Sequence, residues 1–126
     1  MRVTLFVSLV CCMAGFASAA ARAEQTSEAA MLTQEIGAKV PAAWQIHVTW
    51  REDELLAFVT PPYREAFDLW YEPERLRATM LSLCPAKDDS LWARLGQGKR
   101  IVVQPTVGGK SDNAMRLTCP RGAPSG

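Results

Sequence analysis

Apolar and polar residues alternate most clearly over residues 44–50, WQIHVTW. One face of this segment is apolar: Trp44, Ile46, Val48 and Trp50. The other face is polar: Gln45, His47 and Thr49. A period of two is typical of a strand that is buried on one side.

Residues 55–60 predict a second strand, and the charged segment 51–54 predicts a loop of about four residues that closes an antiparallel hairpin. This second strand is apolar on both faces. Leu56 and Phe58 lie on one face, and the other face carries Leu55, Ala57 and Val59. Two apolar faces indicate a central strand or a surface that something else covers.

Two segments show helical spacing instead. Ala29, Leu32, Ile36 and Val40 recur every three or four residues before Pro41. Residues 73–84 begin with a proline, which suits the first helical position, and are followed by Pro85, which ends a helix. Their apolar stripe consists of Leu76, Met80, Leu83 and Cys84. Residues 91–95 predict a short helical turn closed by Gly96.

Residues 64–71 fit two patterns. As a third strand, this segment would turn Phe67, Leu69 and Tyr71 inward. Its outward residues would then be Ala66, Asp68 and Trp70. The alternative is a helical turn over residues 63–70.

Near the C-terminus, residues 101–104 predict a β-branched strand stopped by Pro105. After a turn-rich loop at 108–113, residues 114–119 predict a further strand, with Met115, Leu117 and Cys119 on one face. The resulting pattern is α+β: a small single domain with an antiparallel sheet of about four or five strands, two helices and one disulfide. The domain spans residues 24–119, and residues 120–126 form a small-residue tail that we expect to be disordered.

The first 23 residues have the layout of a secretory signal peptide. Arg2 precedes an apolar run that closes on small residues, with cleavage expected after Ala19 or Ala23. The run is shorter than a membrane-spanning helix requires. We therefore expect a periplasmic or secreted protein with no stable membrane insertion after cleavage.

The cysteines outside this leader are Cys84 and Cys119, which lie 35 residues apart. Disulfides persist in the oxidising compartments that exported proteins enter, and two cysteines allow one intrachain pairing. Cys84 shares its stripe with Met80 and Leu83, and Cys119 shares its face with Met115 and Leu117. Both sulfurs should therefore point into the same core and form a disulfide.

Charge and short motifs argue against several classes of function. Cleavage after Ala23 leaves a net charge of −1, so no basic field is present to hold nucleic acid. The segment Gly109-Lys110-Ser111 lacks the upstream glycine of a phosphate-binding loop and leads into a strand. Residues 52–54 are acidic but lack the spacing and the glycine of a calcium loop. No cofactor and no metal are predicted.

The aromatic residues suggest the function. Tyr63, Arg64, Trp70 and Tyr71 are candidates for a partner-binding surface, because exposed Trp, Tyr and Arg mark binding hot spots. The alternative for Trp70 is packing beneath a helix. The sequence thus favours a small exported binding or accessory protein of the cell envelope or secreted space, which acts on a protein or small ligand and is not an enzyme.

Two other functions remain open. One is a small exported enzyme that uses His47, the sole histidine, with a carboxylate such as Asp53 or Glu65. The other is a structural homodimer joined through the apolar face of Leu55, Ala57 and Val59.

Overall fold

The structure is a computed structural model that describes residues 26–107, 110–111 and 115–121 of the chain. The predicted signal peptide, residues 108–109 and 112–113 of the predicted turn, Ala114 of the predicted strand and the residues after Arg121 lie outside the described residues. The fold is α+β, as predicted. A helix over residues 26–39 comes first. The further elements are β1 (Gln45–Arg51), β2 (Glu54–Thr60), α2 (Tyr63–Trp70), α3 (Pro73–Leu81), α4 (Ser90–Leu95), β3 (Arg100–Val107), β4 (Lys110–Ser111) and β5 (Leu117–Thr118).

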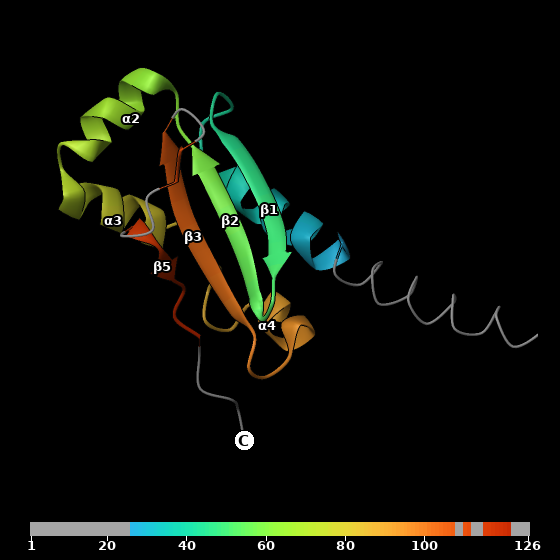
Figure 1. Ribbon diagram of the computed structural model, residues 1–126. Coiled ribbons are helices and arrows are strands. Elements are labelled where there is room, and N and C mark those ends of the chain that lie inside the picture. The colour runs from blue at the N-terminus through green and yellow to red at the C-terminus, as the bar shows by residue number, and fades with distance from the viewer. Residues whose placement is uncertain (1–25, 108–109, 112–114, 122–126) are drawn as a thin grey trace, which may run out of the picture.

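The sheet is mixed, so the prediction of a purely antiparallel sheet was wrong. β1 pairs antiparallel with β2, but β2 pairs parallel with β3. The short strands β4 and β5 both pair antiparallel with β3. A parallel pair requires a crossover connection, and here α2, α3 and α4 form it. The domain therefore contains more helices than the two that the sequence predicted. Figure 1 shows β1, β2 and β3 side by side, with α2 and α3 beyond β3.

The β1–β2 hairpin is present with the predicted alternation, but its loop is shorter than expected. Arg51 pairs with Glu54, which leaves only Glu52 and Asp53 in the turn. Glu52 has a positive φ of 55°, the backbone geometry that two-residue hairpin turns demand. The turn is tied to β3, because the Arg100 amide donates to the Asp53 carbonyl at 2.9 Å.

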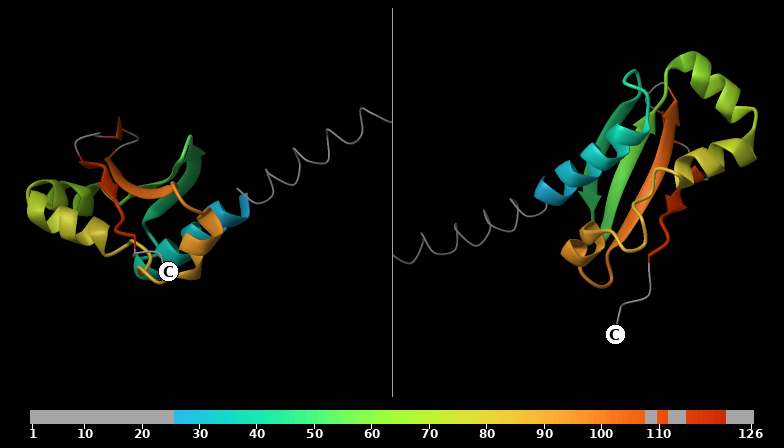
Figure 2. Two further views of the ribbon diagram at one scale, coloured as in Figure 1. Left: turned by 90° about the horizontal axis from the view of Figure 1, so that it is seen from below. Right: turned by 180° about the vertical axis from the view of Figure 1, so that it is seen from behind.

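The hydrophobic core lies between one face of the sheet and the helices. The cross-strand register brings the inward faces of β1 and β2 together, pairing Val48 with Ala57 and Trp50 with Leu55. The view from behind in Figure 2 shows the helix over residues 26–39 and α4 covering this face. The helices contribute buried side chains to this core: Leu32, Ile36, Leu69, Leu76, Met80, Leu91, Trp92 and Leu95. The amphipathic spacing of residues 29–40 and 73–84 therefore identified the correct faces.

The disulfide between Cys84 and Cys119 is present, with Cα atoms 5.5 Å apart. α3 ends at Leu81 rather than at Cys84, and Leu83 is buried in the turn that follows. The predicted strand over 114–119 is also shorter, since β5 contains only Leu117 and Thr118. The covalent link therefore joins the turn after α3 to the residue that directly follows the short strand β5.

β3 continues through Pro105, where the sequence predicted its end. Proline has no amide hydrogen, so it disrupts a strand only where a neighbour needs that donor. The Cys119 amide donates to the Ile101 carbonyl, which shows that odd-numbered residues of β3 point their peptide groups toward β5. Pairing with β5 involves Val102 and Val103, and pairing with β4 begins at Thr106. Pro105 therefore falls in the gap between the two short strands.

Candidate functional site

Residues 63–70 form the helix α2 and Tyr71 caps it, so the prediction of a third strand over 64–71 was wrong and the alternative of a helical turn was right. Its buried residues, Ala66 and Leu69, are three positions apart and attach the helix to the domain. Phe67 and Tyr71, which the strand would have turned inward, are exposed. Helical periodicity thus reverses the predicted orientation of the aromatic side chains.

Three aromatic residues stand in a row on the outer side of α2. Tyr63, Phe67 and Tyr71 are spaced by four residues, so they lie one above another along the helix. Their exposed fractions are 73%, 52% and 74%. The rings of Phe67 and Tyr71 meet edge to face, with centroids 4.8 Å apart, which is a favoured aromatic geometry. We call these three residues the aromatic face of α2.

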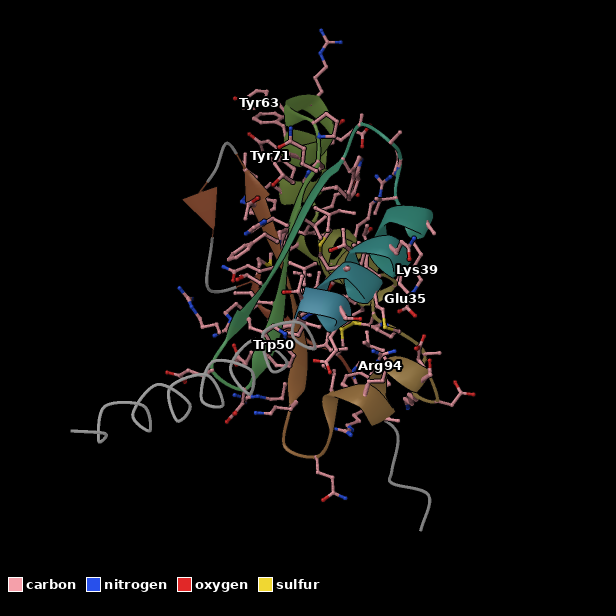
Figure 3. The ribbon with its side chains drawn as sticks, turned by 90° about the vertical axis from the view of Figure 1, so that its right-hand side faces the viewer. Glu35, Lys39, Trp50, Tyr63, Tyr71 and Arg94 are labelled. Atoms are coloured by element: carbon pink, nitrogen blue, oxygen red, sulfur yellow. A yellow bond between two sulfur atoms is a disulfide. The ribbon has the colours of Figure 1, made fainter. Side chains whose placement is uncertain are left out.

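The aromatic face lies at one end of the molecule. Figure 3 shows Tyr63 and Tyr71 together at the α2 end of the molecule, away from Glu35 and Lys39 on the N-terminal helix and from Arg94 on α4. α2 is held in place by a hydrogen bond of 2.6 Å from Trp44 Nε1 to the Glu65 carboxylate, in addition to its buried residues. The aromatic face is therefore carried on an anchored element.

Two hollows flank α2. The outer hollow is lined by Tyr63, Arg64, Phe67 and Asp68. The inner hollow lies between α2, α3 and the start of β1, and is lined by Trp44, Glu65, Asp68, Leu69, Arg75 and Thr79. Asp68 borders both hollows, and among the described residues its carboxylate has no hydrogen-bond or ion-pair partner. Each hollow also contains an arginine, Arg64 in the outer hollow and Arg75 in the inner one.

The predicted partner-binding residues occupy different environments. Tyr63, Arg64 and Tyr71 are exposed, as a binding surface requires. Trp70 is half-buried and packs against the core, but it does so from the end of α2 and not from a strand beneath a helix. Phe67 was missed, because the strand pattern placed it inside. The spacing of four residues between Tyr63, Phe67 and Tyr71 was the signal that identifies it.

His47 lies on the face of the sheet opposite the core. Its ring stacks on Phe58, its cross-strand neighbour, with centroids 6.4 Å apart. The two carboxylates considered as its partners are engaged elsewhere: Asp53 with Lys99 at 2.8 Å, and Glu65 with Trp44. The structure therefore offers no support for the enzyme that uses His47.

The apolar face proposed for a homodimer is covered by the chain itself. Leu55, Ala57 and Val59 have no exposed surface and belong to the core cluster under the helices. A second copy therefore has no access to them in the folded domain. The second apolar face of β2 is explained by packing within the chain.

A pair of carboxyl groups joins the N-terminal helix to α4. Burial raises the pKa of Glu35 to about 7, and a hydrogen bond to Asp89 together with the negative charge of Asp89 acts in the same direction. The pKa of Asp89 is lowered, mainly because its carboxylate caps α4 and accepts a hydrogen bond from the Leu91 amide at 2.9 Å. The hydrogen bond with Glu35 lowers it further. Lys39 opposes the rise at Glu35 and also donates to the Cys84 carbonyl at 2.9 Å.

This pair predicts a pH-dependent stability. A pKa raised by folding stabilises the fold below the unfolded pKa, and this contribution disappears as the pH rises through the folded pKa. The contribution of Glu35 should therefore fade between about pH 5 and pH 8, whereas that of Asp89 changes only at lower pH. We expect Glu35→Gln to reduce the change of stability with pH. At pH 8 the free energy of unfolding of the variant should exceed that of the wild type by about 1 kcal/mol, a value kept small because Glu35 is only partly buried.

Urea unfolding of both proteins at pH 5 and pH 8 measures this effect. Glu74→Gln, which changes an exposed carboxylate on α3, serves as the matched control and should keep the slope of the wild type. A Glu35→Gln protein that loses stability with pH as steeply as the wild type would contradict the prediction.

In the part of the chain that the structure describes, no group of three or more His, Cys, Asp and Glu side chains is arranged to hold a metal ion. No helix among residues 26–107, 110–111 and 115–121 is both long and apolar enough to cross a membrane. The comparisons with known proteins also gave no match: no family model, no curated protein and no solved structure is similar to this chain.

Proposed function

We propose that this protein is an exported binding protein, periplasmic or secreted, that holds a protein partner on the aromatic face of α2 and performs no catalysis itself. The observation that carries the proposal is the row formed by Tyr63, Phe67 and Tyr71, each of which is a residue more than half exposed. Large exposed aromatic residues are costly on a free surface and are enriched where partners bind. The Cys84–Cys119 disulfide supports export, because such bonds persist in oxidising compartments.

The arrangement of α2 favours binding for a second reason. Tyrosine and phenylalanine bring large contact areas and lose little conformational freedom when a partner covers them. Here the rings stand on a helix anchored by Ala66 and Leu69, so the backbone is already ordered before binding. Preorganisation of this kind reduces the cost of association.

Replacing Tyr63, Phe67 and Tyr71 together by alanine should abolish partner binding. Removal of several aromatic hot-spot residues should weaken affinity by about 100-fold or more. The rings are exposed, so the variant should retain the melting temperature of the wild type within a few degrees. Circular dichroism melting checks the fold before binding is compared.

The partner is captured first by site-specific photo-crosslinking in cells that export the protein. A benzophenone amino acid at position 67 should give a crosslinked species that mass spectrometry identifies, and the same group at the exposed position of Lys87 serves as the control. Calorimetry with the identified partner then compares the wild type with the triple variant. A partner that crosslinks only from position 87, or that binds both proteins equally, would refute the proposal.

A further inference from the structure

We propose that two copies of this chain pair through the outer edge of β1, so that their sheets join into one continuous sheet. This inference goes beyond the proposed function and does not rest on it, because α2, which carries the aromatic face, lies beyond β3 on the other side of the sheet (Figure 1). β1 is the end strand of the order β1-β2-β3-β4, and no described strand pairs with its outer side. A strand in this position presents backbone N–H and C=O groups that lack a neighbouring strand.

The hydrogen bonds of β2 show which backbone groups of β1 point outward. The Arg100 amide of β3 donates to the Asp53 carbonyl at 2.9 Å, so the odd-numbered residues of β2 point their peptide groups toward β3. The even-numbered residues of β2 therefore bond to β1, where each lies opposite an odd-numbered residue. The even-numbered residues of β1 consequently turn their peptide groups outward. Two of them, Ile46 and Val48, form no hydrogen bond on that side within the described residues.

β1 lacks the features that usually protect an exposed edge. Natural sheets protect their edges with very short strands, lysine, proline or bulges. The opposite edge of this sheet follows that rule, because β4 and β5 contain two residues each. β1 contains seven residues with no lysine and no proline, and it pairs with β2 without a bulge. A long and regular edge of this kind is suited to the addition of a further strand.

Apolar side chains also remain partly uncovered at this edge. Ile46, Val48 and Trp50 lie on the core face but are only half-buried, whereas the inward residues of β2 have no exposed surface. The N-terminal helix packs on the core face of β1, since a Cβ atom at Gly37 would lie 3.9 Å from Ile46 Cδ1. Figure 3 looks onto the edge and shows this helix beside the strand. A strand added in the plane of the sheet would cover these side chains further.

A second copy of β1 fits the edge because the strand is complementary to itself. In an antiparallel pair centred on Val48, all seven residues of the strand find a partner. Val48 then meets Val48 of the second copy and Ile46 meets Trp50, so residues with outward peptide groups face one another, as an antiparallel ladder requires. The contact uses the same surface on both copies, so it closes as a two-fold dimer and does not continue into a fibre.

The charges of β1 are compatible with this arrangement. Arg51 is the only Asp, Glu, Lys or Arg residue of the strand, and it falls opposite Gln45 of the second copy. His47 falls opposite Thr49 on the polar face, so no like charges are brought together. An interface formed mainly by two seven-residue strands lies at the small end of specific interfaces, so we expect a dissociation constant in the micromolar range.

Sedimentation equilibrium of the oxidised protein, purified from cells that export it, should show a monomer–dimer equilibrium with no larger species. Val48→Pro should weaken the dimer at least about tenfold, because proline removes an outward amide donor and leaves the bonds to β2 intact. Val48→Ile keeps the amide and a β-branched side chain, so it serves as the control and should dimerise like the wild type. Circular dichroism melting verifies that both variants are folded.

A pair of surface variants tests the register without changing a backbone donor. His47→Glu combined with Thr49→Glu places like charges opposite one another between the two copies and should weaken the dimer at least about tenfold. His47→Glu combined with Thr49→Lys places opposite charges there and should restore the dissociation constant to within about threefold of the wild type.

Two results would overturn the inference. The first is a protein that stays monomeric up to about 1 mM, and the second is a dimer that neither Val48→Pro nor the doubly acidic variant weakens. The variant that lacks the three rings of the aromatic face should still dimerise, and a dimer lost there but kept in Val48→Pro would assign the contact to α2 instead. The proposed function fails separately, if the crosslinked partner does not depend on the aromatic face.

Discussion

Replacing Cys84 and Cys119 by alanine should lower the free energy of unfolding by about 3–4 kcal/mol. The disulfide closes a segment of 35 residues, and the chain-entropy model assigns this value to a loop of that length. A domain of about 100 residues has a total stability of roughly 5–15 kcal/mol, so the loss is a large part of it. Urea unfolding of the oxidised wild type and of the double variant measures the difference.

The architecture gives a local reason for this sensitivity. β5 is held to β3 by two residue pairs, Val102 with Thr118 and Val103 with Leu117. A strand this short contributes few hydrogen bonds of its own, so the covalent link to the turn after α3 keeps it in place. In the double variant, hydrogen exchange should accelerate first at the Cys119 position, whose amide donates to the Ile101 carbonyl at 2.8 Å in the wild type.

The control is the wild type itself in a reducing agent, which should match the double variant. Intact mass before and after reduction verifies that the starting protein contains the bond. A double variant that unfolds within about 1 kcal/mol of the oxidised wild type would show that the core, and not the disulfide, holds the C-terminal strand.

The second large effect is expected at Trp92, the buried aromatic residue of α4. It is 4% exposed, and its indole Nε1 donates to the Ala86 carbonyl at 3.0 Å. Arg121 lies over the ring at 5.5 Å and donates to the Trp92 carbonyl at 3.1 Å. Trp92 thus connects α4, the loop before it and the segment after β5.

Trp92→Ala should therefore destabilise the protein by about 3–5 kcal/mol, because it leaves a large cavity in the core. Trp92→Phe should cost less, about 1–3 kcal/mol, because it keeps most of the ring volume but leaves the Ala86 carbonyl without its donor. Chemical denaturation of the two variants separates the packing contribution from that of the hydrogen bond.

Leu81→Ala provides the comparison for this pair, since Leu81 is a helical residue that is 41% exposed. Leu81→Ala should lower the free energy of unfolding by much less than either Trp92 variant does. Equal destabilisation by Trp92→Ala and Leu81→Ala would contradict the role assigned to Trp92.

The disulfide effect concerns the part of the molecule that supports the proposed binding surface. The disulfide fixes the turn after α3, and α3 packs beside α2, which carries the aromatic face. Tyr63, Phe67 and Tyr71 lie outside the core, so their substitution should affect binding while the core keeps its stability. The stability variants and the binding variants therefore test separate properties of the protein.

The candidate site was only partly predictable. Composition and the cluster of aromatic residues pointed to segment 63–71, and Tyr63 and Tyr71 are exposed, although the strand pattern would have turned Tyr71 inward. The segment 63–71 is ambiguous, however, because apolar residues occur at almost every position and satisfy a period of two as well as one of 3.6. The choice of the strand pattern turned Phe67 inward and Trp70 outward, the reverse of the helix.

The sequence by itself determined the features that depend on local pattern or on elimination. Alternation defined the β1–β2 hairpin and its buried face, and helical spacing defined the apolar stripes of residues 29–40 and 73–84. Two cysteines outside the predicted leader allowed only one pairing, Cys84 with Cys119. Each of these inferences needs only neighbouring residues or a count.

Only the tertiary structure decided the features that depend on residues far apart in the chain. The parallel pairing of β2 with β3 and the extension of β3 through Pro105 follow from which strands occupy each edge, and no local pattern encodes that. The tertiary fold also buried Ala66 and Leu69 against the domain, which made α2 a helix and left Tyr63, Phe67 and Tyr71 exposed. Tertiary burial overrides local propensity because the free energy gained by packing exceeds small intrinsic preferences.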